Sequence, residues 1–173
     1  MTAAEVKKIL GLKPHPQEGG WYVRTYESAE LLAPGAFASG RYPGPRHTGT
    51  AIYYLLEPDT FSEMHRLRSD EVFHFYAGDP VEMLQLEEGS AGRRVVLSND
   101  LALGRPQHVV PRGVWQGSRL VPGGAWALLG CSVSPGFEFE DYEEGLRAPL
   151  VAQWPQWAEL ITALTRSQAA DKE

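Results

Sequence analysis

Short hydrophobic stretches alternate with turn residues through most of this chain. Between Thr50 and Val133, apolar or alternating runs are separated by breaks that contain Gly, Pro, Asp or Ser. Such runs are typical of β-strands, and turn residues at this spacing are typical of connections between antiparallel strands. The runs cover residues 50–56, 61–67, 72–77, 81–86, 94–97, 108–110, 114–119 and 125–133. This pattern predicts an all-β fold, an antiparallel sandwich or barrel.

Helical patterns occur only near the two ends of the chain. Thr2 and Glu5 have the spacing of a capping box, which predicts a short helix to about Leu10. A strand is expected over residues 21–26. Near the other end, Pro155 predicts the start of a helix over about 155–167, with one apolar face formed by Trp157, Leu160, Ile161 and Leu164.

No repeat or long interior linker divides the sequence, so we expect a single domain over residues 1–173 with its core over about 20–143. The Pro- and Gly-rich segment 27–49 is long for a plain connection. Such segments are usually either functional loops or poorly ordered.

Composition and charge narrow the classes of function. Of 173 residues, 43% are hydrophobic and 22% are charged, which is typical of a folded globular protein. The net charge of −6 disfavours nucleic acid as a partner. We expect no membrane partner, because no apolar run is long enough to span a bilayer. The single cysteine, Cys131, lies in an apolar stretch, and the first residues do not resemble a secretory signal, so we expect a cytoplasmic protein.

Three polar residues, His65, Glu71 and His74, lie in the most apolar part of the chain. Side chains alternate between the two faces of a strand, so Glu71 shares a face with Phe73 and Phe75, whereas His74 lies on the other face. If Glu71 points into the fold, His74 points away from it. A surface or interface histidine is therefore the alternative to a binding role for His74.

The spacing of these residues resembles two motifs of the cupin family. His65, Glu71 and Gly78 match the first motif, and Gly104, Pro111 and Gly113 match the second. Leu67 and Gln116 stand where the family usually has two further metal-ligating histidines. The resemblance implies a cupin jelly-roll β-sandwich with short helices near both termini.

Further segments resemble the DUF985 subfamily of cupins over nearly the whole chain. They include 15–20, 50–53, 65–67, 70–71, 74–75, 110–115 and 135–137. The resemblance implies a homodimer as the usual assembly, and it does not imply a particular reaction.

The resemblance also implies which residues would hold a metal. His65, Glu71 and Gln116 would bind one divalent ion, although a transition metal normally takes three or four good donors. The alternative is a buried Glu71 carboxylate hydrogen-bonded to His65 or Gln116. Such a pair is equally suited to general acid–base chemistry.

The leading functional hypothesis is a small-molecule site inside the barrel. By resemblance to the sugar-nucleotide epimerases among cupins, it would use His/Glu acid–base chemistry on a sugar nucleotide or carbonyl metabolite. The expected catalytic residues are His65, Glu71 and Tyr54, and the expected substrate-binding residues are Arg24, His74, Phe75, Trp115 and Gln116. Two alternatives stay open: a metal-dependent enzyme with an incomplete ligand set, and a non-enzymatic metabolite-binding module.

The strand over residues 50–56 carries apolar side chains on both faces. A strand with one face in water should alternate with polar residues, so something must cover the second face. The terminal helix can cover part of it. Because Val72, His74 and Tyr76 also need a partner, we expect a twofold homodimer through these strands.

Overall fold

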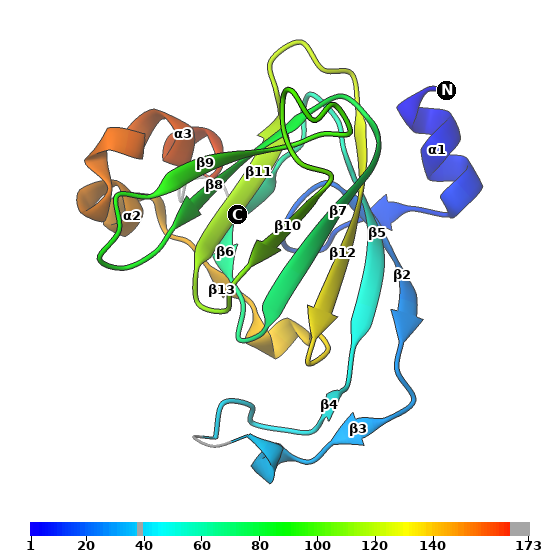
Figure 1. Ribbon diagram of the computed structural model, residues 1–173, viewed down its shortest axis with the longest axis vertical. Coiled ribbons are helices and arrows are strands. Elements are labelled where there is room, and N and C mark those ends of the chain that lie inside the picture. Colours follow the sequence, from blue (N-terminus) through cyan, green and yellow to red (C-terminus); the bar gives the residue numbers. More distant parts are fainter. Residues whose placement is uncertain (38–39, 167–173) are drawn as a thin grey trace, which may run out of the picture.

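The computed structural model describes residues 1–37 and 40–166, and its main feature is a pair of antiparallel sheets packed face to face (Figure 1). The six-stranded sheet has the order β1-β2-β5-β12-β7-β10. Its strands are β1 (Lys13–Pro14), β2 (Trp21–Glu27), β5 (Thr50–Leu56), β7 (Asp70–Gly78), β10 (Gln107–Val110) and β12 (Ala127–Ser134). The predicted antiparallel sandwich is confirmed.

The five-stranded sheet has the order β13-β6-β11-β8-β9. It consists of β6 (Ser62–Arg66), β8 (Val81–Leu86), β9 (Arg93–Leu97), β11 (Trp115–Leu120) and β13 (Glu143–Glu144). The order of strands in the sheet differs from their order in the chain, so residues distant in sequence become neighbours on adjacent strands. Gln116 of β11, for example, lies opposite His65 of β6.

The helices lie near the two ends of the chain, outside the sheets. Helix α1 (Ala3–Leu10) begins at the predicted capping box, in which Thr2 and Glu5 exchange hydrogen bonds. Sequence reasoning missed α2 (Arg147–Gln153), and the predicted single helix over about 155–167 is instead a 3-10 turn, Pro155–Trp157, followed by α3 (Ala158–Ala163). Position 167 lies outside the described residues. None of the helices in 1–37 and 40–166 has the length and apolar character needed to cross a membrane.

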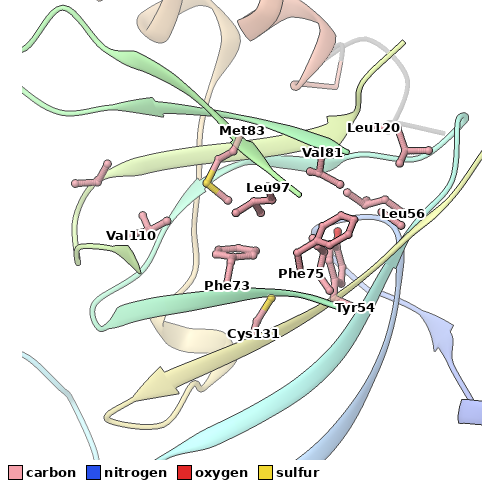
Figure 2. Packing of buried hydrophobic residues seen from close by; sticks show 13 residues of the cluster. Tyr54, Leu56, Phe73, Phe75, Val81, Met83, Leu97, Val110, Leu120 and Cys131 are labelled. Carbon is pink, nitrogen blue, oxygen red and sulfur yellow. The ribbon is translucent and has the colours of Figure 1, made fainter. Parts of the chain in front are cut away.

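The main core fills the space between the two sheets. Figure 2 shows Phe73 of β7 pointing toward Leu97 and Phe75 pointing toward Val81, both of the opposite sheet. The alternation along β7 explains this arrangement, since Phe73 and Phe75 are buried whereas His74 and Tyr76 face outward.

The second apolar face of β5 is covered by the N-terminal segment. Leu55 packs with Val6 of α1 and with Leu12. The terminal helices lie elsewhere, because Leu150 of α2 and Ile161 of α3 pack with the outer face of the five-stranded sheet. The expected covering of β5 by the terminal helix is therefore wrong, since the apolar face of that helix is already occupied.

The long segment after β2 contains β3 (Leu31–Leu32), a 3-10 turn (Pro34–Ala36) and β4 (Arg46–His47). It is fixed to the rest of the fold by the buried side chain of Arg46. The Arg46 guanidinium donates to both Asp141 carboxylate oxygens, at 2.9 and 2.8 Å, and to Glu140 at 2.6 Å. This ion pair joins the segment to the turn around residue 140.

Candidate functional site

A cavity of about 580 Å³ lies at the end of the sandwich where β7 begins and β12 ends, which is the lower end in Figure 1. Its volume is within the range of pockets that hold small molecules. The ionisable side chains that line it include His15, Glu18, His65 and Glu71, which come from three parts of the chain. Leu67, Cys131 and Phe139 contribute apolar wall.

Glu71 is the first inward-facing residue of β7. Gln116 donates a hydrogen bond from Nε2 to Glu71 Oε2 at 2.6 Å, and only 7% of Glu71 is exposed. Burial, followed by the negative charge of Glu18, raises the pKa of Glu71 to about 7, although His65, Gln116 and the Cys131 thiol act in the opposite direction. The carboxyl group therefore changes its charge near neutral pH.

His65 is presented by β6 with a fixed orientation. Its Nδ1 lies 2.6 Å from the carbonyl oxygen of Glu63 and its ring stacks on Tyr142, with 4.9 Å between the ring centroids. A carbonyl oxygen only accepts, so Nδ1 carries the proton and donates it. In the neutral ring, Nε2 is then the nitrogen with the free lone pair.

The loop between β1 and β2 brings His15 and Glu18 to the cavity. It is tied to β6 of the five-stranded sheet: the Glu63 amide donates to the Glu18 carbonyl at 2.9 Å, and Ser62 Oγ donates to the Glu18 carboxylate. Gly19 and Gly20 have positive φ, and a Cβ at Gly20 would lie 2.8 Å from the Tyr54 hydroxyl oxygen. Glycine is therefore required for the close approach of this loop to β5.

Tyr54 holds this loop rather than facing the cavity. Its hydroxyl donates to the carbonyl oxygen of Gly19 at 2.8 Å, and the residue is fully buried. Burial raises the pKa of the Tyr54 hydroxyl well above its usual value. The structure thus gives Tyr54, predicted as catalytic, the geometry of a positioning residue.

The predicted substrate-binding residues separate into two groups. Arg24 lines the cavity and Gln116 contacts Glu71. Phe75 lies in the sealed core, and Trp115 faces outward from β11, where its ring packs under Arg66. His74 lies on the outer face of β7 beside Gln107 and Ser132, because alternation turns it away from Glu71. The structure therefore does not bring Phe75, Trp115 or His74 to the cavity.

Sequence reasoning did not select His15, Glu18 or Cys131 as site residues. His15 and Glu18 precede the pair Gly19-Gly20, for which a tight turn was the alternative interpretation. The pair Gly19-Gly20 was the available signal, since it marks a close approach of the backbone to another surface.

The residues at the barrel interior fit a metal ion poorly. His65 and Glu71 are good donors, and the buried Gln116 Oε1 has no hydrogen-bond partner among residues 1–37 and 40–166. Gln116 Nε2, however, already binds Glu71 Oε2, and Leu67 supplies apolar wall where a further ligand would be needed. Two strong donors and one amide oxygen fall short of the usual three or four ligands.

A candidate metal-ligand set lies instead at the mouth of the cavity. Ligand atoms of Glu27, His47 and Glu138 lie within 4.8 Å of one another, the only such group in the part of the chain that the structure describes. Arg24 is already paired with Glu27 there.

Comparisons with known proteins agree with this architecture. The sequence profile of the family described as Cupin superfamily (DUF985) matches residues 4–144. A crystal structure of protein SO0799 from Shewanella oneidensis is 32% identical, with a TM-score of 0.84 over 97% of this chain and 99% of that one. A hypothetical protein from Leishmania major is 31% identical, with a TM-score of 0.85 over 96% of this chain and 100% of that one.

More distant structures share the fold alone. Oxalate decarboxylase from Bacillus subtilis is 12% identical, with a TM-score of 0.51 over 88% of this chain and 37% of that one. No curated protein is similar enough to this chain to be matched. The profile match over most of the chain, and the two full-length structural relatives, show that this chain belongs to the cupin superfamily, in the family described as DUF985.

Proposed function

We propose that the cavity binds a small carbonyl-containing metabolite, of the keto-acid or sugar-nucleotide class, and catalyses proton transfer on it. The observation that carries the proposal is the Glu71 carboxyl, whose pKa is raised to about 7, in the same cavity as His65. A catalytic acid or base works best when its pKa is close to the working pH.

The two residues have complementary tasks. His65 Nε2 is the base, since its Nδ1–H is bound to the Glu63 carbonyl. When the His65 ring gains a proton, the positive charge favours the ionised form of Glu71, and the Glu71 carboxylate in turn stabilises the imidazolium. His65 can therefore gain a proton while Glu71 is ionised, so that neither charge is left unpaired in the apolar interior.

A thermal-shift screen with keto acids, sugar nucleotides and nucleotides tests binding. A ligand at 100 times its Kd adds about 2.7 kcal/mol of stability, which is easily measured. We expect Glu71→Ala to lose this response while it keeps the fold. Glu71→Gln is the matched control for shape, because its amide can still accept the Gln116 hydrogen bond. A full response in Glu71→Ala would contradict the proposal.

The metal-dependent alternative is tested by metal analysis of protein purified without a metal-affinity column. We expect less than one ion for each chain at the interior residues His65, Glu71 and Gln116, since they offer too few donors. A stoichiometric ion that disappears in His65→Asn would contradict this expectation. A ligand that binds tightly but shows no proton exchange would support the non-enzymatic binding module instead.

We further propose a twofold homodimer through the outer face of β7 and β10. Tyr76 and Val109 on this face are each 48% exposed, and α1 covers only the neighbouring part of the sheet. A twofold pair buries the same patch on both subunits. Light scattering at micromolar concentration should report about twice the 19.1 kDa of the chain, and a monomer would contradict this proposal.

We also propose a cytoplasmic location. The buried free thiol of Cys131 contributes to the cavity wall and the core, where a reducing compartment would preserve it. Microscopy of a fluorescently tagged chain tests this, and a signal confined to the cell envelope would contradict it.

A further inference from the structure

The cavity contains two histidines whose ring protons are fixed by the backbone in opposite ways. His65 Nδ1 faces a carbonyl oxygen, that of Glu63, at 2.6 Å. His15 Nδ1 faces two amide groups, those of Glu18 at 2.9 Å and Gln17 at 3.3 Å. An amide only donates, so His15 Nδ1 must be the accepting nitrogen without a proton. Neutral His15 therefore carries its proton on Nε2, whereas neutral His65 carries it on Nδ1.

The surroundings of His15 keep the Nε2–H group available. The nearest carboxylate atom is Glu18 Oε2, at 4.0 Å from His15 Nε2, which is too long for a hydrogen bond. The ring is held edge-on against Tyr22, with 4.6 Å between centroids, and against Tyr54 at 6.3 Å. Burial and the nearby charges of His65 and Arg166 lower the pKa of His15 against the opposing effect of Glu18, which favours the neutral ring.

We propose that His15 is a second catalytic residue of this cavity, which donates a hydrogen bond from Nε2 to the carbonyl oxygen of the substrate while His65 removes a proton from the neighbouring carbon. This inference rests on the proposed function and narrows its substrate class to carbonyl compounds with a hydrogen on the adjacent carbon. In this scheme His15, rather than the predicted catalytic residue Tyr54, contacts the substrate carbonyl together with the base His65.

The proposed step balances without any further reactant. The C–H bond breaks and its proton goes to His65 Nε2, while its electron pair forms the carbon–carbon double bond of an enolate. The carbonyl electron pair moves to oxygen, where the negative charge accepts the hydrogen bond from His15 Nε2–H. His15 keeps its proton throughout. Return of a proton from His65 to carbon completes the cycle, and exchange with solvent replaces that hydrogen.

The tautomers can be measured directly on the unaltered protein. Long-range ¹H–¹⁵N NMR of histidine-labelled protein above about pH 8, where the imidazole is neutral, should show the proton of His65 on Nδ1 and that of His15 on Nε2. This measurement needs no ligand and no variant. The same tautomer at both positions would overturn the inference.

The catalytic role is tested by hydrogen–deuterium exchange in D₂O, with pyruvate, dihydroxyacetone phosphate and a nucleoside-diphosphate 4-keto sugar as probes. His15→Asn is the informative variant, because the Asn side-chain oxygen can still accept from the Gln17 and Glu18 amides while the distal N–H is lost. Loss of one such donor typically lowers the rate by about 10²- to 10³-fold. We expect that loss in kcat with little change in KM, and a loss of about 10²- to 10⁴-fold in His65→Asn.

His108→Asn serves as the matched control, since His108 bonds Gln85 away from the cavity, and its rate should equal that of the unaltered protein. Exchange that persists unchanged in His15→Asn would overturn the role of His15 and leave the proposed function standing. No exchange of any probe by the unaltered protein would overturn the proposed function, and the role of His15 with it.

Discussion

The two ends of the space between the sheets differ sharply, although the same strands form both. At one end, Phe73 and Phe75 of β7 meet Met83 and Leu97 in a closed apolar core (Figure 2). At the other end, Glu71 of the same strand faces a cavity with His65, His15 and Glu18. The alternation of β7 is continuous through both, so strand geometry alone does not make the difference. The closed end stabilises the fold, whereas the buried ionisable groups at the open end lower the stability of the folded state.

That cost is visible at Glu71. A shift of its pKa from 4.5 to about 7 means that the folded state holds the proton more tightly than the unfolded state. The shift corresponds to about 3 kcal/mol of lost stability once the group is ionised. Ionisable residues persist at such a cost mainly at functional sites.

The largest expected effect comes from opening the closed end. Phe73→Ala removes a ring that is 1% exposed and leaves a cavity in the core. We expect a loss of about 4 kcal/mol in the free energy of unfolding, measured by urea denaturation. A loss below about 1 kcal/mol would mean that this end is not the stabilising one.

The ion pair of Arg46 with Asp141 should have the next largest effect on stability. Arg46→Ala removes the two hydrogen bonds from the guanidinium to the buried Asp141 carboxylate and leaves Arg68, 3.8 Å away, as its cation; loss of a buried partner typically costs about 3 kcal/mol. Glu140→Gln is the control, because Glu140 is half exposed and a surface ion pair contributes less than about 1 kcal/mol. Equal losses in the two variants would contradict the difference between the buried and exposed partners.

Glu71→Gln should sharpen the comparison through its pH dependence. In the unaltered protein, the contribution of Glu71 to stability is greatest below about pH 4.5, falls as the pH rises toward about 7, and is then constant. Glu71→Gln should not show this fall. The difference in the free energy of unfolding between Glu71→Gln and the unaltered protein should therefore be about 2–3 kcal/mol more in favour of the variant at about pH 8 than at about pH 4.5. Parallel stability profiles for the two proteins would show that Glu71 ionises normally.

His15 contributes with the opposite sign, because its lowered pKa gives stability that is lost as the pH falls.

Tyr54→Phe should have the smallest effect on stability. It removes one hydrogen bond, to the Gly19 carbonyl, and keeps the ring in the core, so we expect a loss of about 1 kcal/mol. The loop that carries His15 would lose one of its attachments. Ligand stabilisation should therefore weaken more than the fold does, and an unchanged ligand response would contradict the positioning role of Tyr54.

The sequence was informative about the fold because its signals are local. The runs over 50–56 and 81–86 match β5 and β8, and the capping box at Thr2 and Glu5 begins α1 as expected. The terminal helix was less predictable. Trp154 ends α2, which the sequence did not predict, and the predicted helix is shorter because Trp157 and Leu164, at its two ends, have non-helical backbone conformations.

The site was predictable only where a short connection brings two residues together, here between β6 and β7, which belong to different sheets rather than pairing as neighbours. The loop between His65 and Glu71 is short, and alternation turns both inward. His15 and Glu18 could not be placed in this way, because their approach depends on β2 pairing with β5 and on the bond from Glu63 to Glu18. Phe75 shares the inward face with Glu71, yet it lies deeper, where the side chains of the opposite sheet close the space.

Direct titration of the Glu71 carboxyl tests the contrast between the two ends most directly. Carbon-13 NMR of glutamate-labelled protein, with the resonance assigned by its absence in Glu71→Gln, follows the ionisation of this single group. A midpoint near pH 7 is the result we predict from its burial beside Glu18. A midpoint near the usual value of 4.5 would contradict the account, because the open end would then hold an ionised carboxylate at no cost in stability.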